Sequence, residues 1–233
     1  MQTSKRRFSQ VLAGVGFGAL ANSFSYSAFA SVAAPENGRE YKALRQAQPV
    51  TAVKGIEVIE FFAYYCPHCY ELEPHLAAWV KKQGGNINFK RIHVLNPGVE
   101  AQQKLFFALD AMGKAEELHA KVFEAYHVKR NRLLTDEQVK TFIDSTAIDK
   151  AAFFNAYKSF TVLTKQGRSP RVMSDYEIDT WPSLIIDGRL QTSPVMAARS
   201  LGRVTEQQQN EALIPVLDFL VTKVPKEKST GVE

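Results

Sequence analysis

The chain has 233 residues, of which 45% are hydrophobic and 23% charged, a composition typical of a globular protein with one sizeable domain. Its formal charge is +5, but Lys5, Arg6 and Arg7 lie in an N-terminal segment that we expect to be removed. The remaining 26 basic and 24 acidic residues are nearly balanced, so the composition gives no reason to propose nucleic acid or an anionic membrane surface as a partner.

The N-terminus has the pattern of an export signal. A basic cluster, SKRRF, precedes an apolar stretch, and Ala28 and Ala30 have the small side chains that a signal-peptide cleavage site requires. We therefore predict a cleaved signal peptide over residues 1–30. A permanent membrane helix is the alternative, but Asn22 and Ser23 interrupt the apolar run before the ~20 residues that a span needs. The general secretory route is favoured over the twin-arginine route, because Lys5 replaces the first arginine.

The next segment predicts strands on both sides of a helix. A short edge strand is expected at residues 41–44, and the apolar run IEVIEFFAY from Ile56 indicates a buried central strand. The segment CPHCYELEPHLAAWVKKQGG has apolar residues at helical spacing and ends at Gly84 and Gly85. The following INFKRIHVL alternates apolar and polar residues, as a second strand does. Together they predict a β-α-β unit within a first α/β part over residues 36–97.

Residues 98–174 have a helical pattern throughout and no strand signal. Thr135 with Gln138, and Asp149 after them, are placed to cap helices. A further helix is expected from about Ser159 until Pro170 interrupts it. This block is interpreted as a helical subdomain inserted between strands.

The last part of the chain returns to strands and closes with a helix. WPSLIIDGRLQT predicts a hairpin with a two-residue turn at Asp187 and Gly188. TEQQQNEALIPVLDFLVTKV predicts an amphipathic helix that kinks at Pro215 or starts late because of it. These elements form a second α/β part over residues 175–224, and the lysine-rich residues 225–233 predict a flexible tail.

Both cysteines of the chain, Cys66 and Cys69, lie at the turn from the predicted central strand into the helix. A disulfide between them would close a very short loop, which removes little entropy from the unfolded chain and so stabilises little. A zinc site normally needs four ligands, and the chain has neither a second C-x-x-C pair nor suitably spaced histidines. We predict no metal and assign the histidines outside the motif to packing or the surface. Redox chemistry is the use that remains.

Position predicts different roles for the two sulfurs. At a helix N-terminus the Cys66 sulfur would face unpaired N–H groups and the positive end of the helix dipole, which favour the thiolate. Cys69, one turn further, would be shielded from solvent. Pro67 suits the first helical turn, and His68 adds a donor or a positive charge beside the thiolate, unless it is an ordinary surface histidine. Stabilising the thiolate stabilises the reduced protein, so the disulfide becomes a stronger oxidant.

The stretch EFFAYYCPHCYELEP, the later His93 and Val94, the helical block and WPSLIIDGRLQTSPVMA together resemble the DsbA family of exported thiol:disulfide interchange proteins. The resemblance covers about residues 41–224. It implies an α/β protein with a thioredoxin fold and an inserted helical subdomain, which matches the predicted order of elements. It also implies a monomeric periplasmic enzyme without a cofactor. Such an enzyme oxidises unfolded or newly exported cysteine-containing proteins and is reoxidised by a DsbB-type membrane quinone reductase.

The resemblance carries catalytic roles over by position. Cys66 matches the nucleophile and Cys69 its partner, while Pro67 and His68 match the dipeptide that tunes them. Glu60, on the strand before the motif, matches a buried acidic residue associated with proton movement at Cys69. The alternative for Glu60 is a partnered carboxylate at the end of a strand.

The resemblance also implies a substrate-binding loop and exposes two departures. Pro182 matches a cis-proline whose loop faces the disulfide and pairs with substrate backbone, and Thr180 and Trp181 precede it. Trp181 stands where valine is common in the family, so we expect altered substrate preference and a shifted potential. Arg91 stands where the family often has a lysine. Because a guanidinium keeps its charge, Glu60 alone would carry any proton that moves at this position.

Two other functions stay open at this point. A disulfide isomerase or reductase would use the same motif, although isomerases of this compartment usually have a separate dimerisation domain. From a different class, a thioredoxin fold can serve as a metal-handling or chaperone module that binds unfolded chains.

Overall fold

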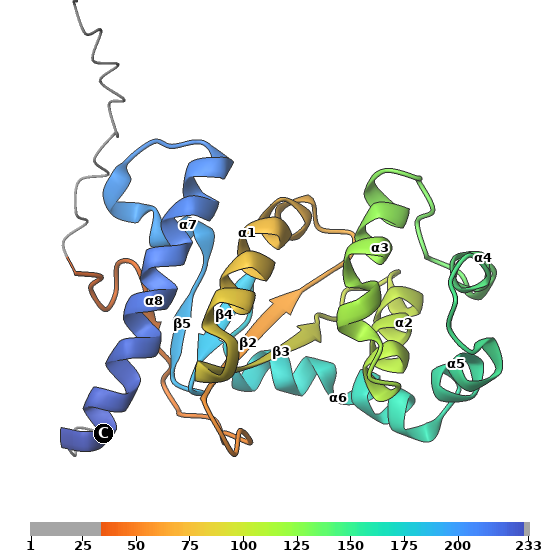
Figure 1. The fold of residues 1–233 in the computed structure, drawn as a ribbon, viewed down its shortest axis with the longest axis horizontal. Helices are drawn as coiled ribbons and strands as arrows, with labels where there is room; N and C mark the ends of the chain where they lie inside the picture. Colours follow the sequence, from red (N-terminus) through yellow and green to blue (C-terminus); the bar gives the residue numbers. More distant parts are fainter. Residues whose placement is uncertain (1–33, 231–233) are drawn as a thin grey trace, which may run out of the picture. The chain divides into compact units, whose positions relative to one another are not determined.

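The computed structural model describes residues 34–230, so the predicted signal peptide lies outside the described residues. Within them, five strands form one sheet in the order β1-β5-β4-β2-β3 (Figure 1). The central strand β2 pairs parallel with β3 and antiparallel with β4, so the sheet is mixed. β1 pairs antiparallel with β5 at one edge, and β3 forms the other edge. The strands are β1 (Lys42–Ala43), β2 (Ile56–Phe62), β3 (Ile87–His93), β4 (Ser183–Ile186) and β5 (Leu190–Thr192).

Alternate residues of β2 pack on opposite faces of the sheet. Val58 packs with two helices, α1 (Pro67–Gln83) and α8 (Glu206–Thr230), which lie side by side (Figure 1). Ile59 and Phe61 belong to a second cluster, which includes the helices between β3 and β4. Because β2 is covered on both faces, its sequence is a nearly continuous apolar run instead of an alternating one.

The segment between β3 and β4 is helical, as the sequence predicts. Thr135 and Asp149 cap two of its helices, accepting hydrogen bonds from the backbone N–H groups of Gln138 and Ala152. The helices of the segment are α2 (Glu100–Ala111), α3 (Ala115–His127), α4 (Asp136–Asp144), α5 (Lys150–Tyr157) and α6 (Phe160–Asp175). The short elements elsewhere are η1 (Gly84–Asn86), α7 (Pro194–Ala197) and η2 (Arg199–Leu201).

Two prolines do not limit their helices as predicted. α6 continues through Pro170 to Asp175, and α8 starts at Glu206, well before Pro215. Both proline rings lie on exposed positions, where water can bind the backbone carbonyl that loses its intrahelical donor. The predicted interruption at Pro170 and the late start at Pro215 are therefore wrong.

The end of α8 and the hairpin also differ from the prediction. α8 extends to Thr230, and Glu227 in its last turns pairs with Arg189 and Lys223, while the flexibility of residues 225–233 stays a prediction. Ile186 pairs with Leu190, so the hairpin loop has three residues instead of two. The backbone N–H of Asp187 donates to the carbonyl of Glu57 on β2, which keeps this residue paired to the sheet.

Candidate active site

The two cysteines lie where the sequence predicts them, at the turn from the central strand into α1. β2 ends at Phe62 and α1 begins at Pro67, with Cys66 as the N-cap residue in an extended conformation (φ −78°, ψ 116°). The Cys66 Sγ accepts a hydrogen bond from the backbone N–H of Cys69 at 3.3 Å. Since proline has no N–H, the first turn directs its remaining donors at the sulfur.

The surroundings give the two thiols different acidities. The pKa of Cys66 is lowered to about 7, chiefly by a hydrogen bond from the Cys69 thiol, and burial opposes this effect. The backbone N–H of Cys69 and the charge of His68 lower it further. Burial, and then the nearby Cys66 and Glu60, raise the pKa of Cys69 well above its usual value. Near neutral pH the thiolate is therefore at Cys66 and the proton at Cys69.

His68 contacts the beginning of the C-terminal helix. Its side chain is 65% exposed, and its Nδ1 lies 2.6 Å from Oε1 of Glu206, the first residue of α8. This hydrogen bond and the charge of Glu206 raise the pKa of His68. His68 is therefore exposed, as expected of an ordinary surface histidine. It is also hydrogen-bonded to Glu206 and lowers the pKa of Cys66, as predicted for a residue that tunes the thiolate.

The loop before β4 lies against the Cys66 sulfur. The Trp181–Pro182 peptide bond is cis, as the resemblance implies. The Cys66 thiol donates to the carbonyl oxygen of Trp181 at 3.7 Å. The Trp181 ring meets the Tyr65 ring edge to face, with the ring centroids 6.4 Å apart. One of these two aromatic residues directly precedes Cys66, and the other offers the Cys66 thiol its backbone carbonyl.

A groove of about 690 Å³ opens beside this loop. Thr180, Trp181 and Pro182 line it together with His68, so the substrate-binding residues named from the sequence share one groove with the cysteine motif. The carbonyl of Thr180 accepts a hydrogen bond from the Ser183 hydroxyl at 2.9 Å, which tightens the loop around the cis bond.

Glu60 is fully buried on β2, six residues before Cys66. Its Oε2 accepts a hydrogen bond from Nε of Arg91 at 2.8 Å, while its Oε1 has no hydrogen-bond partner within residues 34–230. Burial raises the pKa of Glu60 even though Arg91 lowers it. Glu60 is therefore partnered, and it is also close enough to Cys69 to raise the pKa of that thiol.

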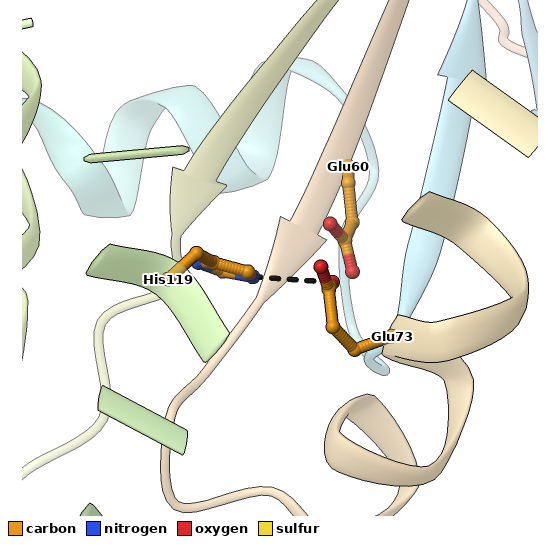
Figure 2. Close-up of side chains that lie close together, drawn as sticks. All are labelled: Glu60, Glu73 and His119. Carbon is orange, nitrogen blue, oxygen red and sulfur yellow. Dashed lines mark ion pairs between the residues drawn. The ribbon is translucent and has the colours of Figure 1, made fainter. Parts of the chain in front are cut away.

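Figure 2 shows that Glu60 lies close to Glu73 from α1 and His119 from α3. One potential ligand atom of each lies within 4.8 Å of the others, a spacing that could hold a metal ion. Arg91 contacts the same carboxylates, with one guanidinium nitrogen 3.0 and 3.1 Å from the two Glu73 oxygens, and it also pairs with Glu116. The guanidinium already supplies the positive charge that both buried carboxylates contact, which disfavours a metal ion there. The absence of a resident metal stays a prediction.

Comparison with known proteins agrees with this geometry. A family described as the DSBA-like thioredoxin domain matches residues 57–207. The thiol:disulfide interchange protein DsbA of Burkholderia cepacia is 41% identical over 201 residues, which cover 85% of this chain and 90% of the relative. The chain belongs to the DsbA family. It is a thiol:disulfide oxidoreductase with a thioredoxin fold and a helical insertion, as the resemblance implies.

Other DsbA proteins support the same relationship. DsbA of Azotobacter vinelandii is 35% identical over 153 residues, covering 65% of this chain and 72% of that protein. The crystal structure of Pseudomonas aeruginosa DsbA superposes with a TM-score of 0.74 at 27% identity, covering 84% of this chain and 97% of the other. In the part of this DsbA-family chain that the structure describes, no helix has the length and apolar character needed to cross a bilayer.

The sequence does not reveal how three histidines of this DsbA-family protein support the motif. All three contact Tyr64, two residues before Cys66. His93 accepts from the Tyr64 backbone N–H at 3.2 Å, His127 donates to its carbonyl at 2.8 Å, and His119 bonds its hydroxyl at 3.2 Å. They come from β3 and α3, so only the folded chain brings them to the turn that leads into the motif.

Two acidic residues near the motif are also absent from the sequence-based site. Glu73 follows Cys69 by four residues on α1, and this helical spacing is a signal that could have placed both on one face. Glu206 is 138 positions from His68, and no local pattern indicates their contact.

Proposed function

We propose that this DsbA-family protein oxidises pairs of cysteines in newly exported polypeptides by giving up a Cys66–Cys69 disulfide. The observation that carries the proposal is the opposite shift of the two thiol pKa values, with Cys66 lowered to about 7 and Cys69 raised. A stabilised thiolate leaves readily from a mixed disulfide and favours the reduced protein. Cys66 is also the sulfur that contacts the groove-lining loop, through the Trp181 carbonyl.

The proposed reaction has two exchange steps. A substrate thiolate attacks Cys66 Sγ, a mixed disulfide forms, and the electron pair of the broken Cys66–Cys69 bond leaves on Cys69, which takes up a proton. The second substrate thiolate then attacks the substrate sulfur of the mixed disulfide, and Cys66 leaves as a thiolate. Two electrons pass from the two substrate sulfurs to the protein, which ends with Cys66 as a thiolate and Cys69 as a thiol.

Glu60 is proposed to supply and remove the proton at Cys69. It is buried, its pKa is raised, and one of its oxygens lacks a partner within the described residues. Arg91 cannot carry this proton because a guanidinium stays charged, so its contribution is to hold the Glu60 carboxylate in place.

The groove beside the cis bond is proposed to bind the substrate chain. Thr180, Trp181 and Pro182 would pair with an extended substrate segment so that one of its cysteines meets Cys66. Pro67 and His68 would tune the thiolate from within the motif, through the missing N–H of the proline and the charge of the histidine.

We place the reaction in the periplasm, on the basis of the export-signal pattern over residues 1–30. That compartment is oxidising, so disulfides made there persist. A membrane quinone reductase of the DsbB type would take the two electrons and restore the disulfide. The protein is proposed to act as a monomer, and thiol–disulfide exchange itself requires no metal or organic cofactor.

Equilibration of the cysteine pair against glutathione buffers tests the direction of electron flow. The expected potential lies well above that of a thioredoxin-type reductant, which is about −270 mV, and towards about −120 mV. A potential near the thioredoxin value would overturn the oxidase assignment in favour of a reductase. Retention of zinc or copper through dialysis, without oxidation of dithiol peptides, would favour a metal-handling module instead.

Serine variants test the roles of the two sulfurs. When each variant is incubated with a disulfide-bonded peptide, Cys69→Ser should accumulate a mixed disulfide at Cys66, because no second thiol is present to release it. Cys66→Ser should form none. Equal trapping by both serine variants would contradict the assignment.

The Glu60→Gln variant should oxidise dithiol peptides about 10-fold more slowly than the parent, in line with the loss of a positioned proton donor.

A further inference from the structure

The contact between His68 and Glu206 joins the cysteine motif to a helix from the far end of the chain. Nδ1 of His68 lies 2.6 Å from Oε1 of Glu206. Glu206 lines both the groove beside the cis bond and a smaller pocket that is bounded by Pro67 and Glu71. It therefore stands next to the reactive turn without belonging to the C-P-H-C motif.

A second contact fixes α8 against α1, so the position of Glu206 does not depend on His68 alone. Asp218 on α8 accepts hydrogen bonds from Trp79 Nε1 at 2.8 Å and from Gln83 Nε2 at 2.6 Å, both on α1. The two contacts are 11 residues apart on α1 and 12 apart on α8, roughly 16 to 18 Å at 1.5 Å per residue. Matching intervals mean that the helices run alongside each other in the same direction, with Glu206 on a fixed element.

We propose that Glu206 is a positioning residue for the redox pair, which holds the imidazole of His68 and its positive charge beside the Cys66 thiolate. The inference rests on the proposed function as a disulfide donor and adds to it a residue outside the motif. Through His68, Glu206 would favour the reduced protein, in which the thiolate is present, and would thereby strengthen the disulfide as an oxidant.

Two effects of Glu206 oppose each other. Its negative charge repels the thiolate directly, whereas its contact with His68 maintains the imidazolium that attracts the thiolate. The charge of His68 lowers the pKa of Cys66, and Glu206 contacts His68 directly at 2.6 Å, so we take the route through the histidine to be the stronger. The two effects can be separated experimentally, because only the second needs His68.

The other charged groups near His68 make no ion pair with it among the described residues. On α1 these are Glu71 and His75, which line the smaller pocket with Glu206. Across the groove they are Lys42, Asp179 and Arg199, of which Lys42 pairs with Glu177. Glu206 is therefore the carboxylate that pairs with His68, and the negative charge of the Cys66 thiolate also raises the pKa of His68.

The pH dependence has a definite window. Well below the ordinary pKa of histidine, 6.5, His68 is mostly protonated with or without Glu206. Well above its raised pKa it is neutral in either case. The effect of Glu206 that passes through His68 is therefore confined to the range around neutral pH, and salt should weaken it because both side chains are substantially exposed.

A double-mutant cycle tests the proposal. The equilibrium constant with glutathione is measured for the parent, Glu206→Gln, His68→Gln and the double variant at pH 5.5 and 7.0 in low salt. At pH 7.0, Glu206→Gln should weaken the oxidant about two- to fivefold more in the presence of His68 than in its absence. At pH 5.5, where most of the His68 imidazole is protonated in either case, this difference should be much smaller. Glu211→Gln removes the same charge from α8 five residues away and should leave the equilibrium unchanged.

Two outcomes would overturn the inference. One is an equal effect of Glu206→Gln at pH 7.0 with and without His68. The other is an imidazole titration of His68, followed by NMR, that is the same in the parent and in Glu206→Gln. The parent's own potential reports separately on the proposed function: a thioredoxin-like value would overturn the oxidase assignment, while the coupling between the two residues would still be measurable.

Discussion

At the scale of single residues, reactivity depends on what surrounds one sulfur atom. The Cys66 sulfur accepts from the backbone N–H of Cys69 on one side, and on the other its thiol meets the carbonyl of Trp181. The donor favours the thiolate, whereas the carbonyl can contact only the protonated form favourably. The loop before β4 thus moderates the stabilisation that the helix provides, and the residue before the cis bond is well placed to alter both potential and substrate choice.

Replacing Trp181 by Val tests this position. The change removes the edge-to-face contact with Tyr65 and one aromatic wall of the groove, but keeps the backbone carbonyl that meets Cys66. Aromatic pairs contribute about 0.5–1.5 kcal/mol, so oxidation of peptides with an aromatic residue next to the cysteine should slow roughly 2- to 10-fold. Peptides with glycine there should change less. Stopped-flow rates on the two peptides measure the preference, and Trp181→Phe is the control that keeps a ring. Unchanged rates and an unchanged potential would contradict a role of Trp181 in substrate preference.

At the scale of elements, α1 is positioned by its neighbour α8 as well as by the sheet. Trp79 is 2% exposed, and its indole N–H donates to Asp218 at 2.8 Å. Asp218 also binds Lys82 and Gln83 in the last turn of α1. These contacts fix the position of α8 along the axis of α1. They therefore also fix where the N-terminus of α8 meets the cysteine turn.

Asp218→Ala should therefore destabilise the protein by about 1–3 kcal/mol, because it leaves a buried indole N–H without an acceptor. Urea unfolding followed by fluorescence measures the change, with the free energies taken at constant slope. In a Trp79→Phe background the cost of the same substitution should be much smaller, since no indole N–H is left unpaired. If Asp218→Ala costs the same in both backgrounds, the tie between Trp79 and Asp218 is not what stabilises the helix pair.

The order and type of the elements could be predicted because each depends on local signals. Apolar periodicity, the cap residues Thr135 and Asp149 and the glycines after α1 all act within a few positions. The errors arose where a local rule depends on the surroundings. Pro170 and Pro215 stay within helices because they lie on exposed faces, and the sequence near them does not show which face is exposed.

At the scale of the whole molecule, the same distinction between local signals and long-range contacts decides which parts of the site could be predicted. The motif and its placement could be predicted because they lie in a short stretch with a strong pattern, whereas the cis bond at Pro182 was expected only from the resemblance to the DsbA family. The contacts of Tyr64 with its histidines and of His68 with Glu206 could not, since each joins segments that are dozens of positions apart. The same holds for the ion pairs of Arg91 on β3 with Glu60 on β2, with Glu73 on α1 and with the exposed Glu116 on α3.

Buried titratable side chains make the stability of the whole molecule depend on pH in two opposite ways. Burial raises the pKa of Glu73 to about 7 and lowers those of His93 and His119 to about 4 and about 3. Between pH 4.5 and 7 the folded protein keeps a proton on Glu73 that the unfolded chain loses, so this contribution to stability falls as pH rises. The histidines are neutral when folded and protonate on unfolding below about 6.5, so their contribution falls as pH falls.

Glu73→Gln should remove the first dependence and leave the second. Relative to the parent, the variant should become more stable between pH 5.0 and pH 7.5, by up to about 3 kcal/mol, since one pKa unit corresponds to about 1.4 kcal/mol. Urea unfolding of both proteins at the two pH values gives this difference directly. Glu71→Gln changes an exposed carboxylate on the same helix and should show no such trend. If the free energies of Glu73→Gln and the parent differ by the same amount at both pH values, the folded protein does not hold a proton on Glu73, and Arg91 keeps that carboxylate ionised throughout.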